Sequence, residues 1–480
     1  MTAPLVVVGD ALLDVDVLGR AGRLSPDAPV PVLDDLETRP RPGGAALAAA
    51  MAAVGGHDVV LVTALGDDEA GQEVRRLLVA VGVRLLRLPY DGATPEKRRV
   101  RAGGQSLVRL DSGGTPGTIG TPPAEVADVL ARAGAVLVAD YGRGVAAADD
   151  VRGLLARLPR RVPVVWDPHP RGAAPLPGAR LVTPNQEEAM LFAQERGCAG
   201  PAGLTGLAAV GRHAAGLQRA WQAQAVAVTL GERGALLSYG DGTPVVTPAP
   251  QVHCVDPCGA GDRFSVTAAL RLGSGQITSE AVQDAVWAAA EYVAAGGPAS
   301  LIPGDTGPQT EPDRHPAADD AHALVRRMSG HGGVVVATGG CFDLLHAGHV
   351  ATLREARRLG DCLVVCLNSD DSVRRLKGPS RPLVPAEDRA RVLEALEFVD
   401  AVTVFDEDTP VETLRKLKPD VWAKGGDYAG ADVPEAAILE EWGGQAVVLP
   451  YLKGHSTTEL VRSAAGTPAA PDHDRPGGDR

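Results

Sequence analysis

The feature that most constrains this sequence is an alternation, repeated in both halves, of short apolar runs with segments of helical length. In the first half the runs include VVLVTAL at 59–65, AVLVAD at 135–140, VPVVWD at 162–167 and AVAVTL at 225–230. Strands that are apolar throughout are buried on both faces, which is typical of parallel sheets covered by helices. The alternation therefore predicts an α/β fold with a parallel sheet.

The same pattern begins again at residues 334–338 (VVVAT) and continues through runs such as CLVVCLNSD at 362–370. Between the two halves the sequence is polar and rich in Pro, Asp and His, which is typical of a linker. We therefore predict an α/β domain at 1–303, a linker at 304–331 with one short helix around Asp319–Met328, a second α/β domain at 332–463 and a disordered tail at 464–480.

Composition excludes several classes of protein. The chain has a formal net charge of −13, whereas nucleic-acid-binding proteins usually carry a basic face. Its 6 cysteines form no C-x-x-C pair, which favours free thiols in a reducing compartment. The N-terminus does not resemble a signal peptide, and no apolar run is long enough to cross a membrane. We expect a cytoplasmic protein without nucleic-acid or membrane partners.

The strongest chemical signal in the first half is Asp256-Pro-Cys-Gly-Ala-Gly-Asp262, which precedes an Ala-rich helical stretch. In a turn that opens a helix, the backbone N–H groups of Gly259, Ala260 and Gly261 can converge on an anion. An aspartate at the end of this turn can take a proton from a hydroxyl that attacks a phosphate there. In isolation, such a turn is more often a glycine-rich helix start with a capping aspartate.

Other motifs accompany this turn in a fixed order: Gly43-Gly44, Thr183-Pro-Asn185-Gln-Glu-Glu188 and Thr229-Leu-Gly231-Glu-Arg-Gly234. Together they resemble the ribokinase (PfkB) family of sugar kinases across residues 4–302. The resemblance implies an α/β/α sandwich with a small β-lid. It also implies that Asp262 is the general base that activates the sugar hydroxyl, next to an anion hole formed by Gly259, Ala260 and Gly261.

The same resemblance implies roles in binding ATP, Mg²⁺ and the sugar. Asn185 and Glu188 match an N-x-x-E motif that positions Mg²⁺ through water. The residues implied to bind ATP are Asn185, Glu188, Thr229, Gly231 and Gly234. The residues implied to face the sugar are Asp14, Gly43 and Gly44, although the local sequence alone is equally consistent with Asp14 as a strand-end cap.

Finer features resemble the kinase domain of bifunctional heptose 7-phosphate kinases, namely Ser25–Val32, Lys97–Asp111 and the segment DYGRG at 140–144. The substrate of those enzymes already carries a phosphate. Cations such as Lys97, Arg99 or Arg109 are candidates to hold that phosphate, and each is as readily a solvated surface charge.

Two positions depart from the family pattern. Leu47 stands where an Asn usually helps to hold the hydroxyls of the sugar, and His169 stands where Lys is common. The loss of the Asn amide points to an altered specificity or a reduced kinase activity.

In the second half, Gly340-Cys-Phe-Asp-Leu-Leu-His346-Ala-Gly348-His349 follows an expected strand and opens an expected helix. Two histidines three positions apart at a helix start can point to one place near the helix N-terminus. There they can donate hydrogen bonds to phosphate oxygens as a pentacoordinate phosphorus forms, while Gly348 permits close approach of a nucleotide. A metal-binding pair, for which no third ligand is evident nearby, and a helix cap without chemistry are the alternatives.

Residues 334–463 resemble the H-x-G-H nucleotidyltransferases of the cytidylyltransferase type, which have a Rossmann-like fold. The matching segments include the FDLLHAGH box, the KGGDY turn and the HSTT segment near the C-terminus. The resemblance implies that His346 and His349 contact a triphosphate and that Lys377 and Lys424 neutralise its charge. The other residues implied to bind nucleotide are Thr338, Phe342, Asp343, Gly348, Asp370, Gly425, Asp427, Ser456, Thr457 and Thr458.

The order of the two domains resembles the bifunctional enzymes of ADP-heptose synthesis. The resemblance implies ATP-dependent phosphorylation of D-glycero-D-manno-heptose 7-phosphate at O1, followed by adenylyl transfer from ATP to heptose 1-phosphate. Both reactions are expected to need Mg²⁺. Because the 7-phosphate must be removed between the two steps and nothing in the sequence resembles a phosphatase, a separate phosphatase is implied.

Two other hypotheses stay open. One is that the same chemistries act on another sugar phosphate or use CTP in the second step. The other is a nucleotidyltransferase with a non-catalytic kinase-like domain, which Leu47 favours and the retained Asp262, Asn185 and Glu188 oppose. Kinases of this family often pair through the β-lid, expected here within residues 12–40 and 84–111, so we expect a homodimer.

Overall fold

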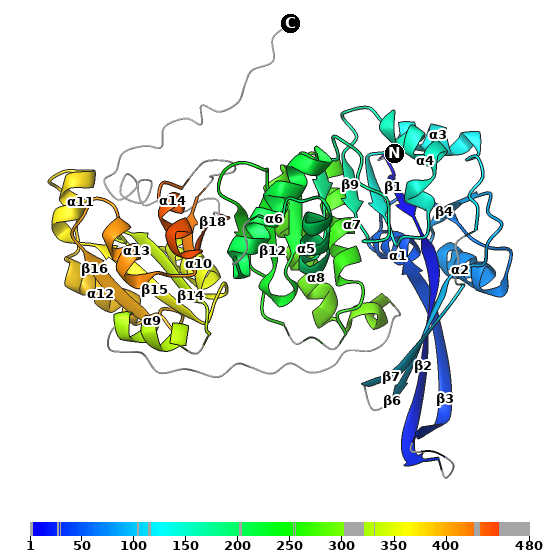
Figure 1. Ribbon diagram of the computed structural model, residues 1–480, viewed down its shortest axis with the longest axis horizontal. Coiled ribbons are helices and arrows are strands. Elements are labelled where there is room, and N and C mark those ends of the chain that lie inside the picture. Colours follow the sequence, from blue (N-terminus) through cyan, green and yellow to red (C-terminus); the bar gives the residue numbers. More distant parts are fainter. Residues whose placement is uncertain are drawn as a thin grey trace, which may run out of the picture. The chain divides into compact units, whose positions relative to one another are not determined.

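The computed structural model describes residues 3–25, 28, 30–102, 105–113, 117–200, 204–252, 254, 256–301, 321–330, 332–426 and 433–450. The chain divides into two compact units, one made mainly of residues up to Glu311 and the other mainly of residues from Pro312 onward. In Figure 1 the described elements of the first unit run from blue to green, and those of the second run from yellow-green to red. Each unit has the α/β fold that the sequence predicted.

A central sheet forms the core of the first unit, because its strands are short apolar runs that bury both faces. The strands are β1 (Leu5–Gly9), β4 (Val59–Ala64), β5 (Arg84–Leu88), β8 (Ala135–Ala139), β9 (Val164–Asp167), β10 (Leu181–Val182), β11 (Val226–Thr229), β12 (Ala235–Ser238) and β13 (Val245–Thr247). Their order is β5-β4-β1-β8-β9-β10-β11-β12-β13, with parallel pairing from β5 to β11. The carboxyl ends of the parallel strands therefore meet at one edge, where ligands bind in open α/β sheets.

Helices pack against this sheet. They are α1 (Ala45–Val54), α2 (Glu69–Ala80), α3 (Ala124–Ala131), α4 (Asp149–Ala156), α5 (Gln186–Glu195), α6 (Gly206–Trp221), α7 (Ala260–Gly273) and α8 (Thr278–Ala294), with 3₁₀ turns η1 (Val145–Ala147), η2 (Gly231–Arg233) and η3 (Gly297–Leu301). Helix α7 packs on β8 and β9 and between α1 and α8, so its first turn is held at the middle of the sheet.

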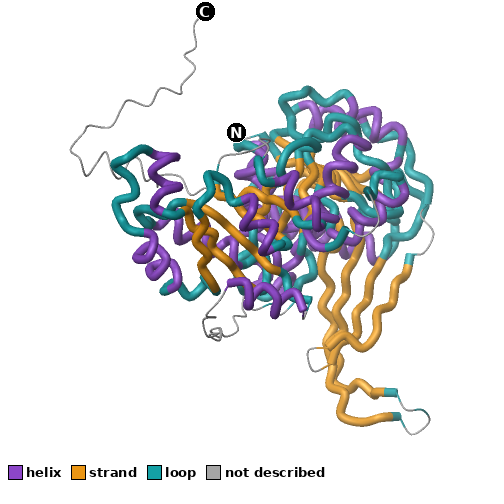
Figure 2. Tube along the Cα trace, turned by 60° about the vertical axis from the view of Figure 1, so that its left-hand side comes forward, coloured by secondary structure: helices purple, strands orange, loops and turns teal. Residues whose placement is uncertain are grey.

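A separate sheet forms the predicted lid and extends away from the body of the first unit (Figure 2). It consists of β2 (Ala11–Leu24), β3 (Pro31–Gly44), β6 (Glu96–Ala102) and β7 (Gln105–Ser112), in the order β3-β2-β6-β7. We expected the lid to include residues 84–111, but the lid strands in this segment begin only at Glu96. Arg84–Leu88 is β5 and pairs with β4 in the central sheet, because its apolar residues complete the buried edge there.

The core of the second unit is a parallel sheet of β14 (Val335–Gly340), β15 (Cys362–Asn368), β16 (Ala401–Phe405), β17 (Val421–Gly425) and β18 (Gln445–Leu449). Its helices are α9 (Ala321–Gly330), α10 (Ala347–Arg357), α11 (Asp370–Lys377), α12 (Ala386–Glu394), α13 (Val411–Leu417) and α14 (Ala436–Leu439), with the turn η4 (Glu440–Trp442). The order β16-β15-β14-β17-β18 reverses direction between β14 and β17. Such a reversal opens a crevice at the carboxyl ends of the strands, where ligands bind.

Only part of the predicted linker falls within the described residues. Ala321–Gly330 forms α9, the short helix expected near this position, and α9 packs on β14, β16 and α13 of the second unit. The domain boundaries stay predictions, and the tail at 464–480 lies outside the described residues. Among the helices described, none combines the length and the apolar character that crossing a membrane requires.

Candidate active sites

The first candidate site surrounds the start of α7. Gly259 precedes the helix with a φ of 81°, a left-handed conformation that glycine adopts without strain. A Cβ on Gly259 would lie 3.0 Å from the side chain of Leu47, whereas a Cβ on Gly261 would meet nothing within 4 Å. The turn is therefore packed against the protein at one end and open at the other. The N–H of Ala260 donates to the carbonyl oxygen of Pro257 at 3.1 Å, whereas Gly261 begins the helix beside open space.

Asp262 lies in this first helical turn with 8% of its surface exposed. One of its carboxylate oxygens accepts a hydrogen bond from the hydroxyl of Tyr141 at 2.6 Å. Burial raises the pKa of Asp262 to about 7, while the bond from Tyr141 acts against this rise, Asp14 adds to it and Lys97 opposes it. A carboxylate that titrates near neutral pH suits a general base, because it is available in its ionised form and still accepts a proton.

Asp10, which follows the carboxyl end of β1, holds Tyr141 in position through hydrogen bonds. The carboxylate of Asp10 accepts hydrogen bonds from the backbone N–H groups of Tyr141, Arg143 and Val145 at 2.9, 2.9 and 3.0 Å. These bonds fix the loop that follows β8. The sequence analysis placed Tyr141 only within a family segment and assigned no role to it, because its contact with Asp262 joins residues that are far apart in the chain.

The predicted sugar-binding residues Asp14, Gly43, Gly44 and Lys97 meet at the base of the lid. Asp14 on β2 is buried and lies in register with Lys97 on β6. A Cβ on Gly43 would lie 2.8 Å from a carboxylate oxygen of Asp14, and a Cβ on Gly44 would lie 2.5 Å from the carbonyl oxygen of Asp10. The glycine pair therefore lets β3 pass close to both aspartates.

Most cations on the inner face of the lid are paired with carboxylates. The ion pairs are Arg99–Asp14 at 2.8 Å, Arg41–Asp16 at 3.0 Å, Arg101–Asp256 at 3.0 Å and Arg109–Asp111 at 3.0 Å. Lys97 differs, since its ammonium lies 5.5 Å from the centre of the Tyr141 ring and makes no ion pair among the described residues. The assignment of Lys97 and Arg109 to a sugar phosphate stays a prediction.

Leu47 is a packing residue in this structure. Its side chain is 2% exposed and forms one cluster with Met51, Tyr292 and Val293, against which Ala260 packs. The hydroxyl of Tyr292 donates a hydrogen bond to the carbonyl oxygen of Cys258 at 3.1 Å. The residue that departs from the family pattern therefore packs against the turn that precedes α7.

Asn185 and Glu188 form a reciprocal cap at the start of α5. The backbone N–H of Glu188 donates to the side chain of Asn185 at 2.9 Å, and the backbone N–H of Asn185 donates to the carboxylate of Glu188 at 2.9 Å. Asn185 also forms a β-bridge with Thr229. Burial, followed by the charges of Asp262 and Glu188, raises the pKa of Asp167 well above its usual range, so these three carboxyl groups lie in one region.

The predicted ATP-binding glycines flank η2. Gly231 and Gly234 have φ values of 64° and 92°, and a Cβ on Gly234 would lie 1.9 Å from the carbonyl oxygen of Thr247. The tight turn after β11 thus requires glycine at position 234. It also places Gly231 next to Thr229 at the carboxyl end of the sheet.

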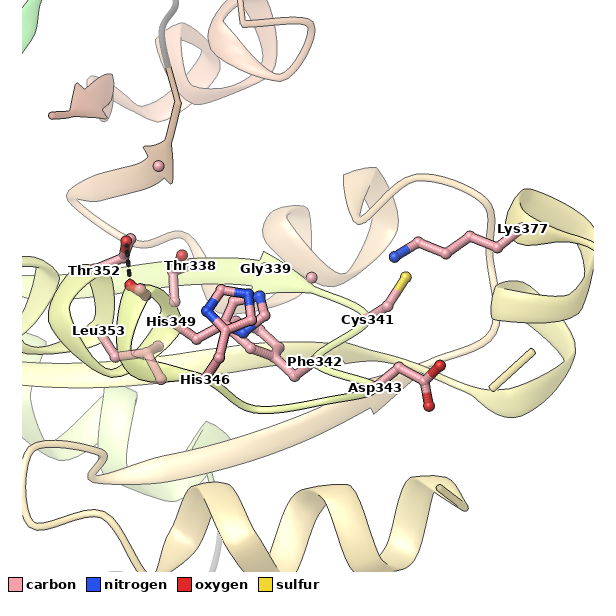
Figure 3. Close-up of a pocket in the computed structure, with 13 residues that line it drawn as sticks. Thr338, Gly339, Cys341, Phe342, Asp343, His346, His349, Thr352, Leu353 and Lys377 are labelled. Atoms are coloured by element: carbon pink, nitrogen blue, oxygen red, sulfur yellow. Dashed lines mark hydrogen bonds between the residues drawn. The ribbon is translucent and has the colours of Figure 1, made fainter. Parts of the chain in front are cut away.

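The second candidate site is a cavity of about 360 Å³ at the carboxyl ends of β14 and β17, where the strand order reverses (Figure 3). The cavity brings together these predicted residues: Thr338, Phe342, Asp343, His346, Gly348, His349, Lys377 and Gly425. The hydroxyl of Thr338 donates to the carbonyl oxygen of Ala423 at 2.7 Å and so joins the two strands.

The two histidines stand side by side at the start of α10. His346 precedes the helix, and its ring stacks on the ring of His349 with 3.8 Å between centres, as Figure 3 shows. Phe342 packs on His349 with 5.3 Å between ring centres. Burial, followed by the charges of His346 and Lys377, lowers the pKa of His349 to about 4. At neutral pH His349 is therefore uncharged and donates a hydrogen bond through a single ring N–H.

Asp343 organises the wall of this cavity. It is 4% exposed, accepts hydrogen bonds from the backbone N–H groups of Leu383 and Val384 at 2.6 and 3.1 Å, and pairs with Arg381 at 2.9 Å. Its contacts hold the loop between α11 and α12. The structure therefore gives Asp343 a supporting position in the cavity wall.

Sequence reasoning missed Arg389, which is 2% exposed. Its guanidinium donates hydrogen bonds to the carbonyl oxygens of Cys341 and Asn368 at 2.5 and 3.0 Å, and to the carboxylate of Asp370 at 2.7 Å. Arg389 thereby ties the ends of β14 and β15 to the start of α11. Arg389 belongs to a largely polar helix, in which a further arginine does not stand out. The sequence therefore carries only a weak signal for its role.

The two lysines predicted to neutralise phosphate charge in the second site, Lys377 and Lys424, lie in different surroundings. Lys377 ends α11, and its ammonium points back toward Cys341 in the cavity (Figure 3). Lys424 on β17 is paired with Glu435 at 2.9 Å and does not line the cavity. The remaining predicted residues, Asp427, Ser456, Thr457 and Thr458, lie outside the described residues.

Comparison with known proteins identifies the family of each unit. Residues 3–304 match the pfkB family of carbohydrate kinases, and residues 337–462 match the cytidylyltransferase-like family. The chain is 57% identical over 462 residues to the bifunctional protein HldE of Streptomyces coelicolor, with 96% of each chain covered. It is 39% identical to the bifunctional protein HldE of Azorhizobium caulinodans, with 96% of this chain and 98% of that one covered. The chain therefore belongs to the family of bifunctional HldE proteins, with a pfkB-family carbohydrate kinase domain followed by a cytidylyltransferase-like domain.

Proposed function

We propose that this protein carries out two steps of ADP-heptose biosynthesis. The first unit transfers the terminal phosphate of ATP to O1 of D-glycero-D-manno-heptose 7-phosphate. The second unit transfers the adenylyl group of ATP to heptose 1-phosphate and releases pyrophosphate. The observation that carries this proposal is the presence, in one chain of the HldE family, of a buried Asp262 beside an anion-binding turn and of paired histidines at a helix start.

In the kinase unit, Asp262 takes the proton from O1 as that oxygen attacks the terminal phosphorus of ATP. The N–H groups of Gly259 and Gly261 stabilise the charge on the phosphoryl group during its transfer, whereas the N–H of Ala260, also predicted for the anion hole, already donates to Pro257 at 3.1 Å. Tyr141 keeps the carboxylate of Asp262 oriented through the 2.6 Å hydrogen bond. The bond from O1 to phosphorus forms as the bond from phosphorus to the leaving oxygen of ADP breaks.

ATP and Mg²⁺ fit the donors that this unit presents. Asp167, Glu188 and Asp262 bring three carboxyl groups into one region, and burial, followed by the charges of Asp262 and Glu188, raises the pKa of Asp167. A divalent cation relieves such repulsion, and carboxylate oxygens with water are the ligands that Mg²⁺ prefers. Asn185 and Glu188 would hold the ion through water, beside ATP along Thr229, Gly231 and Gly234. The ion would neutralise charge on the phosphates during transfer.

In the second unit, His346 and His349 donate hydrogen bonds to the oxygens of the α-phosphate as the phosphate of heptose 1-phosphate attacks it. Because His349 is neutral, its hydrogen bond to the phosphate is weaker before the reaction and strengthens as negative charge develops on the phosphate oxygens. Lys377 adds a positive charge at the other side of the cavity. Thr338, Gly348 and Gly425 bound the space for the nucleotide, and Mg²⁺ is expected here too.

The proposal extends to partners and location. A separate phosphatase must remove the 7-phosphate between the two steps. A homodimer formed through the lid is supported by the outer strand β7, where Leu107, Val108 and Leu110 are 41%, 47% and 54% exposed. Exposed apolar residues on an edge strand favour pairing with a second copy. The free thiols of the described cysteines support a location in the reducing cytoplasm.

The test assays the full-length protein and two variants in both reactions. Asp262→Asn is expected to slow phosphorylation of heptose 7-phosphate by about 100-fold or more, because the general base is lost. His349→Ala is expected to slow adenylyl transfer by about 100-fold or more, because a transition-state hydrogen bond is lost. Each variant should keep the other reaction at its wild-type rate. A variant that slows both reactions equally, or neither, would contradict the assignment of one reaction to each unit.

A further inference from the structure

The turn that precedes α7 is held from two sides. On the side of α8, the hydroxyl of Tyr292 donates a hydrogen bond to the carbonyl oxygen of Cys258 at 3.1 Å. The backbone of Asp256 passes close to Gly297 of η3, where a Cβ would lie 2.4 Å from the carbonyl oxygen of Asp256. On its other side the turn meets arginine side chains from the lid strands β3 and β6.

The lid arginines contact the first residues of this turn. On β6, the guanidinium of Arg99 donates to Sγ of Cys258 at 3.8 Å, and that of Arg101 donates to the carboxylate of Asp256 at 3.0 Å. Side chains two positions apart on a strand point to the same side, and these two neighbouring contacts show that the turn runs along one side of β6. Arg41 of β3 adds a contact of 4.0 Å to the same sulfur. The lid therefore touches the turn through three side chains, and Arg101 makes the only ion pair among these three contacts.

Asp256 divides its carboxylate between the lid and the turn. One oxygen accepts the hydrogen bond from Arg101, and the other accepts the backbone N–H of Cys258 at 3.0 Å. The same peptide unit is held at its other end, because the carbonyl oxygen of Pro257 accepts the N–H of Ala260 at 3.1 Å. The position of the Asp256 carboxylate therefore sets the orientation of the peptide between Pro257 and Cys258.

The next peptide unit carries the N–H of Gly259, which is proposed to stabilise the transferring phosphoryl group. The N–H and C=O of a trans peptide point in opposite directions. Because the carbonyl of Cys258 is turned toward the hydroxyl of Tyr292, the N–H of Gly259 points away from Tyr292. The two peptide units share the Cα of Cys258, so a tilt of the first one turns this N–H. Donors to a transition state lose much of their effect when they are displaced by even a fraction of their contact distance.

We infer that Arg101 is a positioning residue for phosphoryl transfer: through Asp256 it holds the peptide units that direct the N–H of Gly259 toward the phosphoryl group. The inference rests on the proposed kinase function and adds a role for the lid in shaping the anion hole. The side chains of Arg101 and Asp256 are 21% and 20% exposed. A pair that is this accessible to water adds little to stability, so its removal should leave the fold intact.

The first test compares wild type with Arg101→Gln, Arg101→Lys and a matched control, Arg98→Gln. Arg98 lies on the same strand, and its guanidinium pairs with Glu96 of that strand. We expect Arg101→Gln to lower kcat for phosphorylation of heptose 7-phosphate by about 10-fold, with the KM values of both substrates within about 2-fold of wild type. Arg101→Lys should stay within about 3-fold of the wild-type kcat, because an ammonium can make the single contact to Asp256. Arg98→Gln should behave as wild type.

A double-mutant cycle with Asp256→Asn tests whether Arg101 acts through Asp256. The Asn side chain keeps an acceptor for the N–H of Cys258 and removes the charge that Arg101 binds. If the two residues act as one unit, adding Arg101→Gln to Asp256→Asn lowers kcat no further. Independent, additive losses would overturn the inference, because Arg101 would then act through another group.

Binding of ADP with aluminium fluoride, which mimics the phosphoryl group during transfer, gives a measurement that does not depend on the sugar. Calorimetry is expected to show that Arg101→Gln weakens this complex by about 10-fold and leaves the affinity for ADP alone unchanged. An equal loss of affinity for both ligands would contradict the inference, since the variant would then have disturbed the nucleotide site as a whole.

The outcomes separate this inference from the proposed function. If wild type phosphorylates heptose 7-phosphate and Arg101→Gln keeps the wild-type kcat, the positioning role is wrong and the kinase function stands. A higher KM for heptose 7-phosphate at unchanged kcat would also overturn the positioning role, because Arg101 would then contact the substrate. If wild type transfers no phosphate to heptose 7-phosphate while Arg101→Gln weakens only the aluminium fluoride complex, the proposed reaction fails and the positioning role stands.

Discussion

At the scale of single residues, the groups around Asp262, the proposed general base of the kinase unit, set the pKa of its carboxyl group. Burial raises the pKa of Asp262 to about 7, and Asp14 adds to the rise, whereas Tyr141 and Lys97 stabilise the ionised form. Without these two opposing contacts the carboxylate would be protonated over more of the physiological range. Tyr141 is therefore a positioning residue that also sets the pH at which Asp262 can act.

Replacing Tyr141 with Phe tests this coupling. The hydroxyl donates a hydrogen bond to the charged form of Asp262, so its removal raises the pKa of Asp262. The acid limb of the kcat/KM profile for phosphorylation, where activity rises with pH, is expected to move upward by about one pH unit. Measured kcat/KM between pH 5.5 and 9 gives the shift.

The matched control for that variant is Tyr239→Phe, a tyrosine that directly follows β12 and has no contact with Asp262. Its profile should match that of wild type. A Tyr141→Phe profile with the wild-type acid limb, or one displaced toward lower pH, would show that the hydroxyl does not act on the base.

At the scale of elements, the packing of Leu47 shows how α1, α7 and α8 hold the turn that is proposed to bind the phosphoryl group. Its side chain packs with Met51 of the same helix and with Tyr292 and Val293 of α8, and it contacts the position of Gly259. The sequence pattern assigned this position to sugar binding in the family, and here a buried contact replaces it. The turn is thus supported by apolar packing.

Leu47→Asn is expected to lower the free energy of unfolding of the kinase unit by about 3 kcal/mol, because it removes apolar packing and buries an amide without partners. Leu47→Met keeps the volume and should cost less than about 1.5 kcal/mol. Denaturant unfolding of both variants measures the difference. An Asn variant as stable as wild type, with a lower KM for the sugar, would instead mean that the position faces the substrate.

The sequence predicted the elements that carry local chemistry and missed those that act through long-range contacts. The GAGD turn and the HAGH box are contiguous, so their residue types and spacing predict helix starts with converging N–H groups. Tyr141 reaches Asp262 across 121 positions and Arg389 reaches Cys341 across 48, and no local pattern reports such contacts. The apolar run of β5 was wrongly assigned to the lid, since periodicity does not tell which sheet a strand joins.

The sequence likewise does not show which charged residues form ion pairs. Lys97, Arg99 and Arg109 are equivalent cations in the linear pattern, and only the structure shows that Arg99 pairs with Asp14 on the neighbouring strand and Arg109 with Asp111 along β7.

At the scale of the whole molecule, the chain joins two sites that use positioned donors in different ways. The kinase unit combines a buried carboxylate with a helix start, and the second unit combines a pair of stacked histidines, of which His349 is neutral, with a helix start. In the proposed sequence of reactions, the product of the first unit becomes a substrate of the second only after the 7-phosphate has been removed. The two activities should therefore be separable in one preparation of the protein.

Mass spectrometry of the products formed by the full-length protein with ATP and Mg²⁺ tests the central claim most directly. The account predicts that heptose 7-phosphate yields a heptose bisphosphate and ADP, and that heptose 1-phosphate, supplied separately, yields ADP-heptose and pyrophosphate. Product from heptose 1-phosphate alone would contradict the kinase half and would leave a nucleotidyltransferase joined to a non-catalytic kinase-like unit. Absence of both products would contradict the account as a whole.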